Sequence, residues 1–117
     1  MSIRIEDLPT LDLSDIIEPG ATPIPATHPG DILMNEFMAP HGLNAHQLAL
    51  ALRVPANRIT AIVKGERAVS ADTAMRLARH FGTSAEFWLN LQTRFDLELA
   101  RQTLGHEIER EVLPLAA

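Results

Sequence analysis

Between residues 29 and 100, apolar side chains recur roughly every three or four positions, with polar side chains between them. This spacing predicts a series of amphipathic helices, and capping or helix-breaking residues indicate where each one ends. We expect five helices, over about 29–38, 44–53, 55–64, 70–81 and from residue 83 or 84 onward. The pattern therefore predicts an all-α, five-helix domain.

Several polar and glycine positions set the expected limits of these helices. The first should begin at Pro29 and stop at Pro40 and Gly42, and Ser70 should cap the fourth, which Gly82 closes. The fifth opens at Thr83 or Ser84, since Thr83 with Glu86 fits a capping box. It should run through Leu99, with Ile108 as its furthest end and Gly105 as a weak point. The side chains expected to face inward before the fifth helix are Ile32, Leu33, Phe37, Leu48, Ala49, Leu52, Val54, Ile59, Ile62, Val63, Ala74, Leu77, Ala78 and Phe81.

The most informative segment reads NAHQLALALRVPANRITAIVKGER, from Asn44 to Arg67. Asn44 is a good helix cap that Gln47 can answer in a capping box. Ala49 leaves room for two helices to cross closely, and Pro55 fits the first turn of the second helix. Gly65 should end that helix. Two short helices joined by a tight turn are typical of a helix-turn-helix DNA-binding unit.

The second helix of this pair leaves small and polar side chains exposed. Asparagine can pair with adenine, arginine with guanine or phosphate, and alanine or the threonine methyl can contact thymine. Lysine and arginine at the far end can hold the phosphate backbone without reading sequence. The alternative is an ordinary pair of surface helices in a small bundle. The candidate DNA-binding residues are Asn44, Ala45, Ala56, Asn57, Arg58, Thr60, Ala61, Lys64 and Arg67.

The charge distribution supports this interpretation. The chain carries a net charge of −5, which argues against nonspecific nucleic-acid binding. Residues 44–80, however, contain six basic and two acidic side chains, whereas residues 1–36 contain one basic and seven acidic. The positive field therefore coincides with the proposed DNA-binding unit. The acidic flanks either weaken indiscriminate binding and meet a basic partner, or are simply solvated.

Length and composition limit the remaining possibilities. A chain of 117 residues has the size of one domain, here divided into an acidic, proline-containing arm (1–28), the helical domain (29–100) and a helical tail (101–117). The arm is expected to be extended and to order only against another surface. With no cysteine, disulfides and thiolate sites are excluded. Because no membrane span or signal segment is recognisable, we expect a cytoplasmic protein.

The fifth helix supports two interpretations. Phe87, Trp88, Leu91 and Phe95 recur at helical spacing and could form a two-fold interface. A dimer would place two reading helices one DNA turn apart, about 34–36 Å. Alternatively, Phe87, Trp88 and Leu91 close the core of a single chain. We expect part of this helix to serve both purposes.

Catalytic and metal-binding patterns are weak. His41 and His46 lack a carboxylate partner at ligand spacing, and His106–Glu107 begins like a zinc-protease motif but has Arg110 where the second ligand belongs. His80 is expected at the surface, and the glycines fit turns and caps. We therefore expect no enzyme activity, no metal and no cofactor.

Four motifs give the chain a family resemblance. HPGDIL begins at His28, IVKGER follows the second reading helix, and SADTAMRLARHFGTS and FWLNLQ follow further along. From His28 to about Ala100 the chain resembles the HigA antitoxins, also called VapI-type plasmid-maintenance antidote proteins. The resemblance implies a lambda-repressor-like (Xre-type) DNA-binding domain and a homodimer bound to operator DNA upstream of its own genes. It also implies a RelE-like (HigB-type) partner toxin that cleaves mRNA.

Alternatives of other classes remain open. A stand-alone Xre-family repressor without a toxin would have the same helices, and its arm or last helix would sense a ligand or partner. A protein-binding adaptor is a third possibility, but it leaves the face from Asn57 to Lys64 unexplained. The arm before His28 is longer than is usual in the family, so its role does not follow from the resemblance.

Overall fold

The computed structural model describes residues 27–116, and helices are the only regular secondary structure in that range. Five helical segments follow one another, as the spacing of apolar residues predicted, although the first consists of three kinds of helical turn. The arm expected over residues 1–28 lies almost entirely outside the described residues. The elements are α1 (Pro29–Ile32), η2 (Leu33–Met38), η3 (Ala39–His41), α2 (Ala45–Leu52), α3 (Ala56–Val63), α4 (Ala71–Phe81) and α5 (Ala85–Glu111).

The first segment continues further than its prolines suggested. An α-helical turn passes into a π-helical stretch and then a 3₁₀ turn. Pro40 lies inside that last turn, near its beginning, where a proline needs no donor from its own nitrogen. Pro40 therefore does not itself end the segment, whereas the predicted stop at Gly42 is confirmed. The chain ends the segment at Gly42, whose φ of 65° is a conformation that glycine adopts easily.

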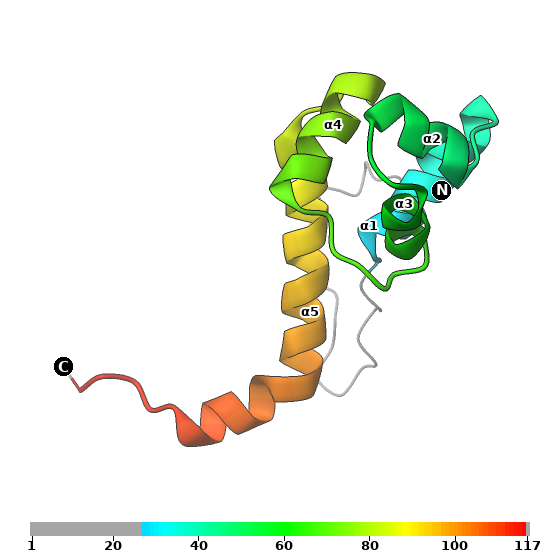
Figure 1. The fold of residues 1–117 in the computed structure, drawn as a ribbon. Coiled ribbons are helices and arrows are strands. Elements are labelled where there is room, and N and C mark those ends of the chain that lie inside the picture. The colour runs from blue at the N-terminus through cyan, green and yellow to red at the C-terminus, as the bar shows by residue number, and fades with distance from the viewer. Residues whose placement is uncertain (1–26, 117) are drawn as a thin grey trace, which may run out of the picture.

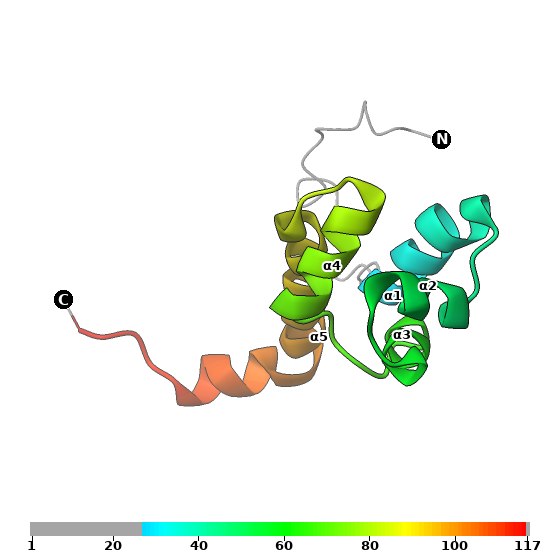
Figure 2. The same cartoon turned by 45° about the horizontal axis from the view of Figure 1, so that its top comes forward.

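The core lies where α1–α4 meet the first half of α5. Figure 1 and Figure 2 show α4 lying against this half of α5, with α1, α2 and α3 beside them. Trp88 of α5 is completely buried, and its ring centroid lies 5.0 Å from that of Phe37. The other apolar side chains of the core are Leu33, Met38, Leu48, Ala49, Leu52, Ile59, Ile62, Val69, Ala74 and Leu77.

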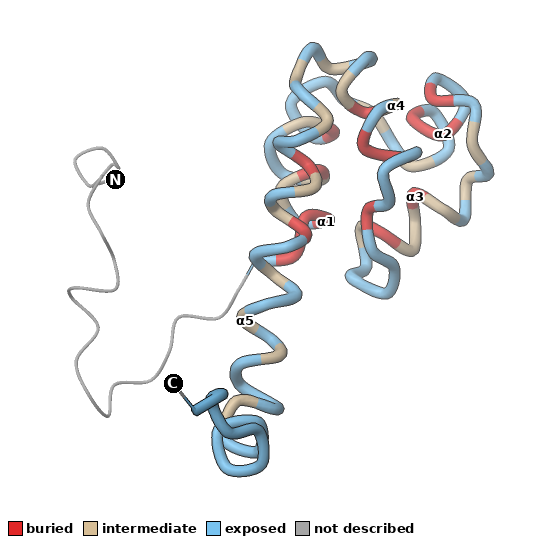
Figure 3. Tube along the Cα trace, turned by 90° about the vertical axis from the view of Figure 1, so that its left-hand side faces the viewer, coloured by how far each residue is buried: buried red, intermediate tan, exposed pale blue. Residues whose placement is uncertain are grey.

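The cap of helix α5 lies one residue after Thr83, the first candidate. The Ser84 hydroxyl accepts a hydrogen bond from the Phe87 backbone N–H at 3.0 Å, so Ser84 is the cap and the proposed Thr83–Glu86 capping box is wrong. The Thr83 hydroxyl instead accepts a hydrogen bond from the Trp88 indole nitrogen at 2.8 Å. The helix continues through Gly105 to Glu111, beyond the predicted end, and only Trp88 and Gln92 of this helix are buried. Its distal part projects away from the core and is exposed (Figure 1, Figure 3).

The start of α1 is held closely against the end of α3. His28 caps α1, since its Nδ1 accepts a hydrogen bond from the Gly30 backbone N–H at 2.9 Å. A Cβ atom on Gly30 would overlap the carbonyl oxygen of Ile62 and lie only 2.8 Å from that carbonyl carbon. Glycine is thus required here by the close approach of two backbones. The HPG part of the HPGDIL motif therefore sets the position of α3.

The capping role of His28 depends on its neutral form. Its ring is buried and lies edge-on to Phe95, with centroids 4.8 Å apart. Burial lowers the pKa of His28 below its ordinary value of 6.5, although the charges of Asp31 and Asp96 act in the opposite direction. An Nδ1 atom that accepts a hydrogen bond must also be unprotonated. Protonation therefore opposes the folded structure.

We accordingly expect the folded chain to lose stability as the pH falls below 6.5, the unperturbed pKa of histidine. The unfolded chain binds the proton first, because the pKa of His28 is lower in the folded state. Thermal melting at about pH 7.5 and about pH 5.5 measures this loss. His28→Asn is the control, since asparagine can cap the helix without titrating. An equal decrease in melting temperature for both proteins would show that His28 is not the titrating group.

Candidate nucleic-acid interface

The turn between α2 and α3 has the geometry of a helix-turn-helix unit. The capping box at the start of α2 is confirmed. Asn44 Oδ1 accepts from the Gln47 backbone N–H at 2.8 Å, and Gln47 Oε1 accepts from the Asn44 N–H at 2.9 Å. Leu52 ends α2, and Arg53 adopts a left-handed conformation with φ 62°. Pro55 is the residue before α3, not part of its first turn as predicted, and α3 begins at Ala56.

Helix α3 ends in a hydrogen-bonded glycine cap. The Gly65 N–H donates to the Ile62 carbonyl at 3.0 Å, and the Glu66 N–H donates to the Ala61 carbonyl at 2.9 Å. With φ 78° at Gly65, this is a Schellman motif, which satisfies carbonyls that the helix leaves without partners. The expectation that Gly65 ends this helix is confirmed. The motif also fixes where Lys64 and the following loop leave α3.

The candidate contact residues of α3 differ in how much surface they present. Ile59 and Ile62 are buried, as predicted, so the opposite face is the one available to a partner. Asn57 and Lys64 are exposed, whereas the other candidates on this helix are half-buried: Ala56, Arg58, Thr60 and Ala61. The Thr60 hydroxyl donates to the Ala56 carbonyl at 3.2 Å, so it is already engaged within the helix.

The remaining candidates lie beside this face. Asn44 is exposed, but its side-chain oxygen is already used in the capping box. Ala45 is half-buried at the first turn of α2, and Arg67 is exposed in the loop after α3. Position and exposure therefore favour Asn57, Lys64 and Arg67 as the freest of the candidates. Contact with DNA stays a prediction for all of them.

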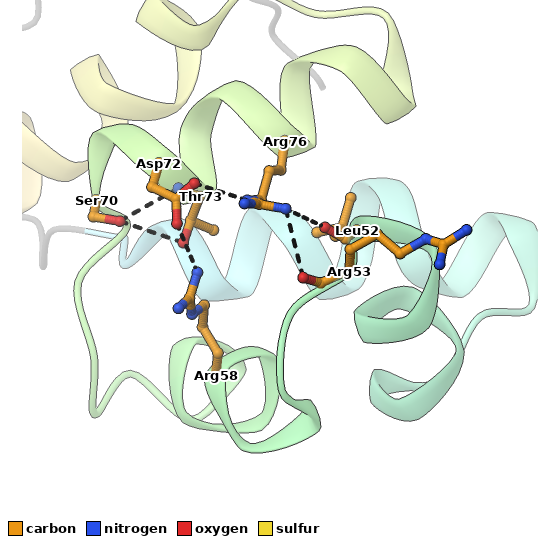
Figure 4. Close-up of polar contacts among 7 residues, drawn as sticks. All are labelled: Leu52, Arg53, Arg58, Ser70, Asp72, Thr73 and Arg76. Atoms are coloured by element: carbon orange, nitrogen blue, oxygen red, sulfur yellow. Dashed lines mark hydrogen bonds and ion pairs between the residues drawn. The ribbon is translucent and has the colours of Figure 1, made fainter.

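Arg58 is engaged by a network that the sequence did not indicate. Its Nη1 donates to Asp72 Oδ2 at 2.9 Å, and its Nε is shielded without a hydrogen-bond partner in the part of the chain described. Arg76 donates from Nε to Asp72 Oδ1 at 2.7 Å and from Nη1 to the Leu52 carbonyl at 2.8 Å (Figure 4). The network joins α3, the first two turns of α4 and the end of α2. It therefore braces the helix-turn-helix turn where Arg53 is left-handed.

The two arginines also determine the charge state of Asp72. Hydrogen bonds from Arg76 and then Arg58 hold the pKa of Asp72 below its ordinary value of 3.8. The carboxylate is thus ionised throughout the neutral range and neutralises part of the positive charge near α3. The basic side chains of this region that remain exposed are Arg53, Lys64, Arg67 and Arg79.

The four aromatic and apolar positions of α5 are not equivalent. Trp88 is 0% exposed in the single chain, so it has no surface left for a partner and belongs to the core, as the second interpretation of this helix expected. Phe87 is 37% exposed, while Leu91 and Phe95 are half-buried. A two-fold interface on this helix therefore depends on the neighbours of Trp88, and the interface itself stays a prediction.

Other kinds of site find little support in the part of the chain described. Among residues 27–116, no three His, Asp or Glu side chains gather as a metal site would require. None of the helices there is both long and apolar enough to cross a membrane. His80 is exposed, as expected, and lines an open pocket of about 640 Å³ between α2 and α4 together with Met75 and Arg79.

Comparison with known proteins identifies the class and then the family. Residues 35–88 match the sequence model of the family described as helix-turn-helix, so the chain is an Xre-type helix-turn-helix protein. It is 51% identical over 86 residues to virulence-associated protein I of Dichelobacter nodosus, which covers 74% of this chain and 80% of that protein. The chain belongs to the HigA family of antitoxins, and the family resemblance seen in its motifs is confirmed.

Solved structures agree with this assignment. An addiction-module antidote protein of the HigA family from Coxiella burnetii is 48% identical and superposes with a TM-score of 0.75, covering 79% of this chain and 100% of the other. The Pseudomonas aeruginosa antitoxin HigA, solved with the higBA promoter, is 44% identical with a TM-score of 0.75, covering 78% and 99%. The predicted fold class, a five-helix lambda-repressor-like domain, is therefore confirmed. The first of these relatives is an antidote protein and the second an antitoxin.

Proposed function

We propose that this chain is the antitoxin of a type II toxin–antitoxin module and represses its own transcription. As a homodimer in the cytoplasm, it binds operator DNA upstream of its own gene, and it neutralises a RelE-like (HigB-type) mRNA-cleaving toxin by direct contact. The observation that carries this proposal is the α2–α3 unit, whose exposed face holds Asn57 and Lys64. The Pseudomonas antitoxin solved with promoter DNA, 44% identical, supports the same use of this unit.

In this proposal α3 lies in the major groove. Asn57, in the first turn of α3, is exposed and can bond to an adenine edge. Ala56, Ala61 and the Thr60 methyl provide the apolar contacts that thymine methyl groups accept. Lys64 and Arg67, at the other end of α3 and in the loop beyond it, neutralise phosphates and set the register of binding. The side chains thus divide into base readers and backbone contacts.

The proposed dimer follows from the same geometry. One short reading helix covers only half of an operator, and two of them related by a two-fold axis read a palindrome whose half-sites are centred one helical turn apart. Phe87, exposed at the start of α5 beside the buried Trp88, is the aromatic side chain best placed to join two copies. Leu91 follows one turn later on the same helix face.

Analytical ultracentrifugation of Phe87→Ala should show dissociation at concentrations where the wild type is dimeric.

The contact assignment makes different predictions for Asn57 and Lys64. Asn57→Ala should cost about 1–3 kcal/mol of binding free energy at one operator base pair and remove discrimination there. Lys64→Ala should weaken binding to all duplexes alike. The slope of log affinity against log salt concentration should become shallower by about one unit. Anisotropy titrations with the upstream duplex and its single-base-pair variants measure both effects. If Asn57→Ala kept the wild-type discrimination, Asn57 would not be a base reader.

The toxin part of the proposal has a separate test. A toxin gene adjacent to this one should arrest growth when expressed alone, and co-expression of this chain should restore growth and co-purify with the toxin. DNA binding without such a partner would instead identify a stand-alone Xre-family repressor. If the wild-type chain bound neither DNA nor a toxin, the remaining interpretation would be a protein-binding adaptor.

A further inference from the structure

The Arg58–Asp72–Arg76 network occupies the position where the reading helix meets the rest of the domain. Asp72, in the first turn of α4, binds one arginine with each carboxylate oxygen, at 2.9 Å to Arg58 and 2.7 Å to Arg76. Arg76 in turn donates to the last carbonyl of α2, that of Leu52, at 2.8 Å. Figure 4 shows the carboxylate of Asp72 between the two guanidinium groups. A single side chain outside the helix-turn-helix unit thus contacts α3 directly and α2 through Arg76.

We propose that Asp72 is a positioning residue for operator recognition, which fixes the guanidinium of Arg58 so that it reads one base pair and does not move freely among phosphates. The inference rests on the proposed operator binding and adds a determinant of specificity to it. Asp72 itself need not touch DNA. Its effect reaches the operator through Arg58.

The surroundings of Arg58 support a fixed orientation. Its side chain is only 21% exposed, its Nη1 is bonded to Asp72, and its Nε is shielded from solvent. Because Nη1 carries two N–H groups and bonds Asp72 through one of them, its second N–H and those of Nη2 remain for pairing with a base. Arginine pairs with guanine through two parallel N–H groups, so its orientation decides whether this pairing is geometrically possible. A carboxylate that binds one side of an arginine restricts its rotamers, so less conformational entropy is lost when the guanidinium pairs with a base.

Electrostatics give the same network a second consequence. An unrestrained arginine at the edge of a DNA-binding surface adds a mobile positive charge, which phosphates of any sequence attract. The Asp72 carboxylate, 55% exposed, compensates that charge locally. Both ion pairs end on Asp72, which is 55% exposed, and ion pairs with such an exposed partner contribute little to folding, so the main expected effect of the network is on the orientation of Arg58. Removing the charge of Asp72 should therefore affect specificity more than stability.

The test is the ratio of operator affinity to nonspecific affinity in Asp72→Asn. We expect the ratio to fall by roughly tenfold, because one base pair is read less well and nonspecific binding increases. The nonspecific salt slope should become steeper by about one unit, as a freed Arg58 adds a phosphate contact. Anisotropy titrations with the upstream duplex and a scrambled duplex, at two salt concentrations, give all of these quantities. Glu98→Gln is the matched control, since it breaks the Arg101–Glu98 pair, 2.7 Å long, on the distal part of α5.

A double-mutant cycle separates positioning from a general structural effect. If Asp72 acts through Arg58, Asp72→Asn should change the ratio in the wild type and leave it unchanged in the Arg58→Ala background. Asp72→Glu should restore most of the ratio because it restores the charge. Arg58→Lys provides an independent variant should Asp72→Asn fold poorly, and it should lower discrimination while retaining the positive charge.

The outcomes distinguish this inference from the proposed function. A wild type without preference for the upstream duplex would overturn operator binding and this inference with it. A wild type that prefers the upstream duplex, with an unchanged ratio in Asp72→Asn, would overturn the inference alone. If Asp72→Asn lowered the ratio of operator to nonspecific affinity equally in the Arg58→Ala background, the inference would also be overturned, since Asp72 would then act by another route.

Discussion

Trp88→Ala should lower the free energy of unfolding by about 3–5 kcal/mol, the usual cost of removing a large aromatic side chain from a core. Trp88 is fully buried, its ring packs 5.0 Å from that of Phe37, and its indole nitrogen donates to Thr83 at 2.8 Å. The substitution leaves a cavity and removes the hydrogen bond to the Thr83 hydroxyl. Urea denaturation followed by circular dichroism, at one fixed protein concentration, measures the loss.

Phe87→Ala is the matched control for this prediction. Phe87 neighbours Trp88 on the same helix, with ring centroids 5.0 Å apart, but it is 37% exposed in the single chain. Its removal should cost the single-chain fold much less than removal of Trp88 and should act mainly on self-association. A Trp88→Ala protein whose free energy of unfolding lies within about 1 kcal/mol of the wild-type value would contradict the assignment of Trp88 to the core.

Gly30→Ala is expected to be the second severe substitution, with a loss of at least about 3 kcal/mol, at the upper end for overpacking. The added Cβ would overlap the carbonyl oxygen of Ile62 and lie 3.0 Å from Val63 Cα. These are backbone atoms of the last turn of α3, so no side-chain rotation can relieve the clash. α1 must separate from α3 or α3 must shift, and a shift would also weaken operator binding.

Gly105→Ala tests whether this effect is due to contact and not to glycine as such. Gly105 lies within α5, and a Cβ there would meet no atom within 4 Å. Alanine should stabilise this helix by about 0.5–1 kcal/mol, because glycine is the poorer helix former. If Gly30→Ala and Gly105→Ala changed stability in the same direction, the close approach of α1 to α3 would not be the reason for glycine at position 30.

Much of the fold could be predicted because its signals are local. The Asn44–Gln47 capping box, the Ser70 cap and the glycines at 65 and 82 each act within a few residues, and the structure confirms all of them. Errors arose where two neighbouring residues could serve equally well. Ser84 and not Thr83 caps α5, because the Thr83 hydroxyl is engaged by Trp88. The π-helical turns of the first segment have no distinct signal in the spacing of apolar residues.

The site was less predictable because its decisive contacts are not local. Arg58 and Asp72 are 14 positions apart, and Arg76 reaches a carbonyl 24 positions earlier. Periodicity places Arg58 on the exposed side of α3 but cannot say which way a long side chain turns. It also could not decide between core and interface for Trp88, since both require an apolar side chain at the same spacing. Tertiary packing alone decides these two cases.

The central proposal, recognition of operator DNA through α3, is tested most directly by titrating the wild-type protein with a duplex from the region upstream of its own gene. A scrambled duplex of the same composition and two salt concentrations complete the measurement. Operator binding predicts a clear preference for the upstream duplex and an affinity for both duplexes that decreases as salt increases. Equal affinity for the two duplexes would contradict the proposal that this chain represses its own transcription.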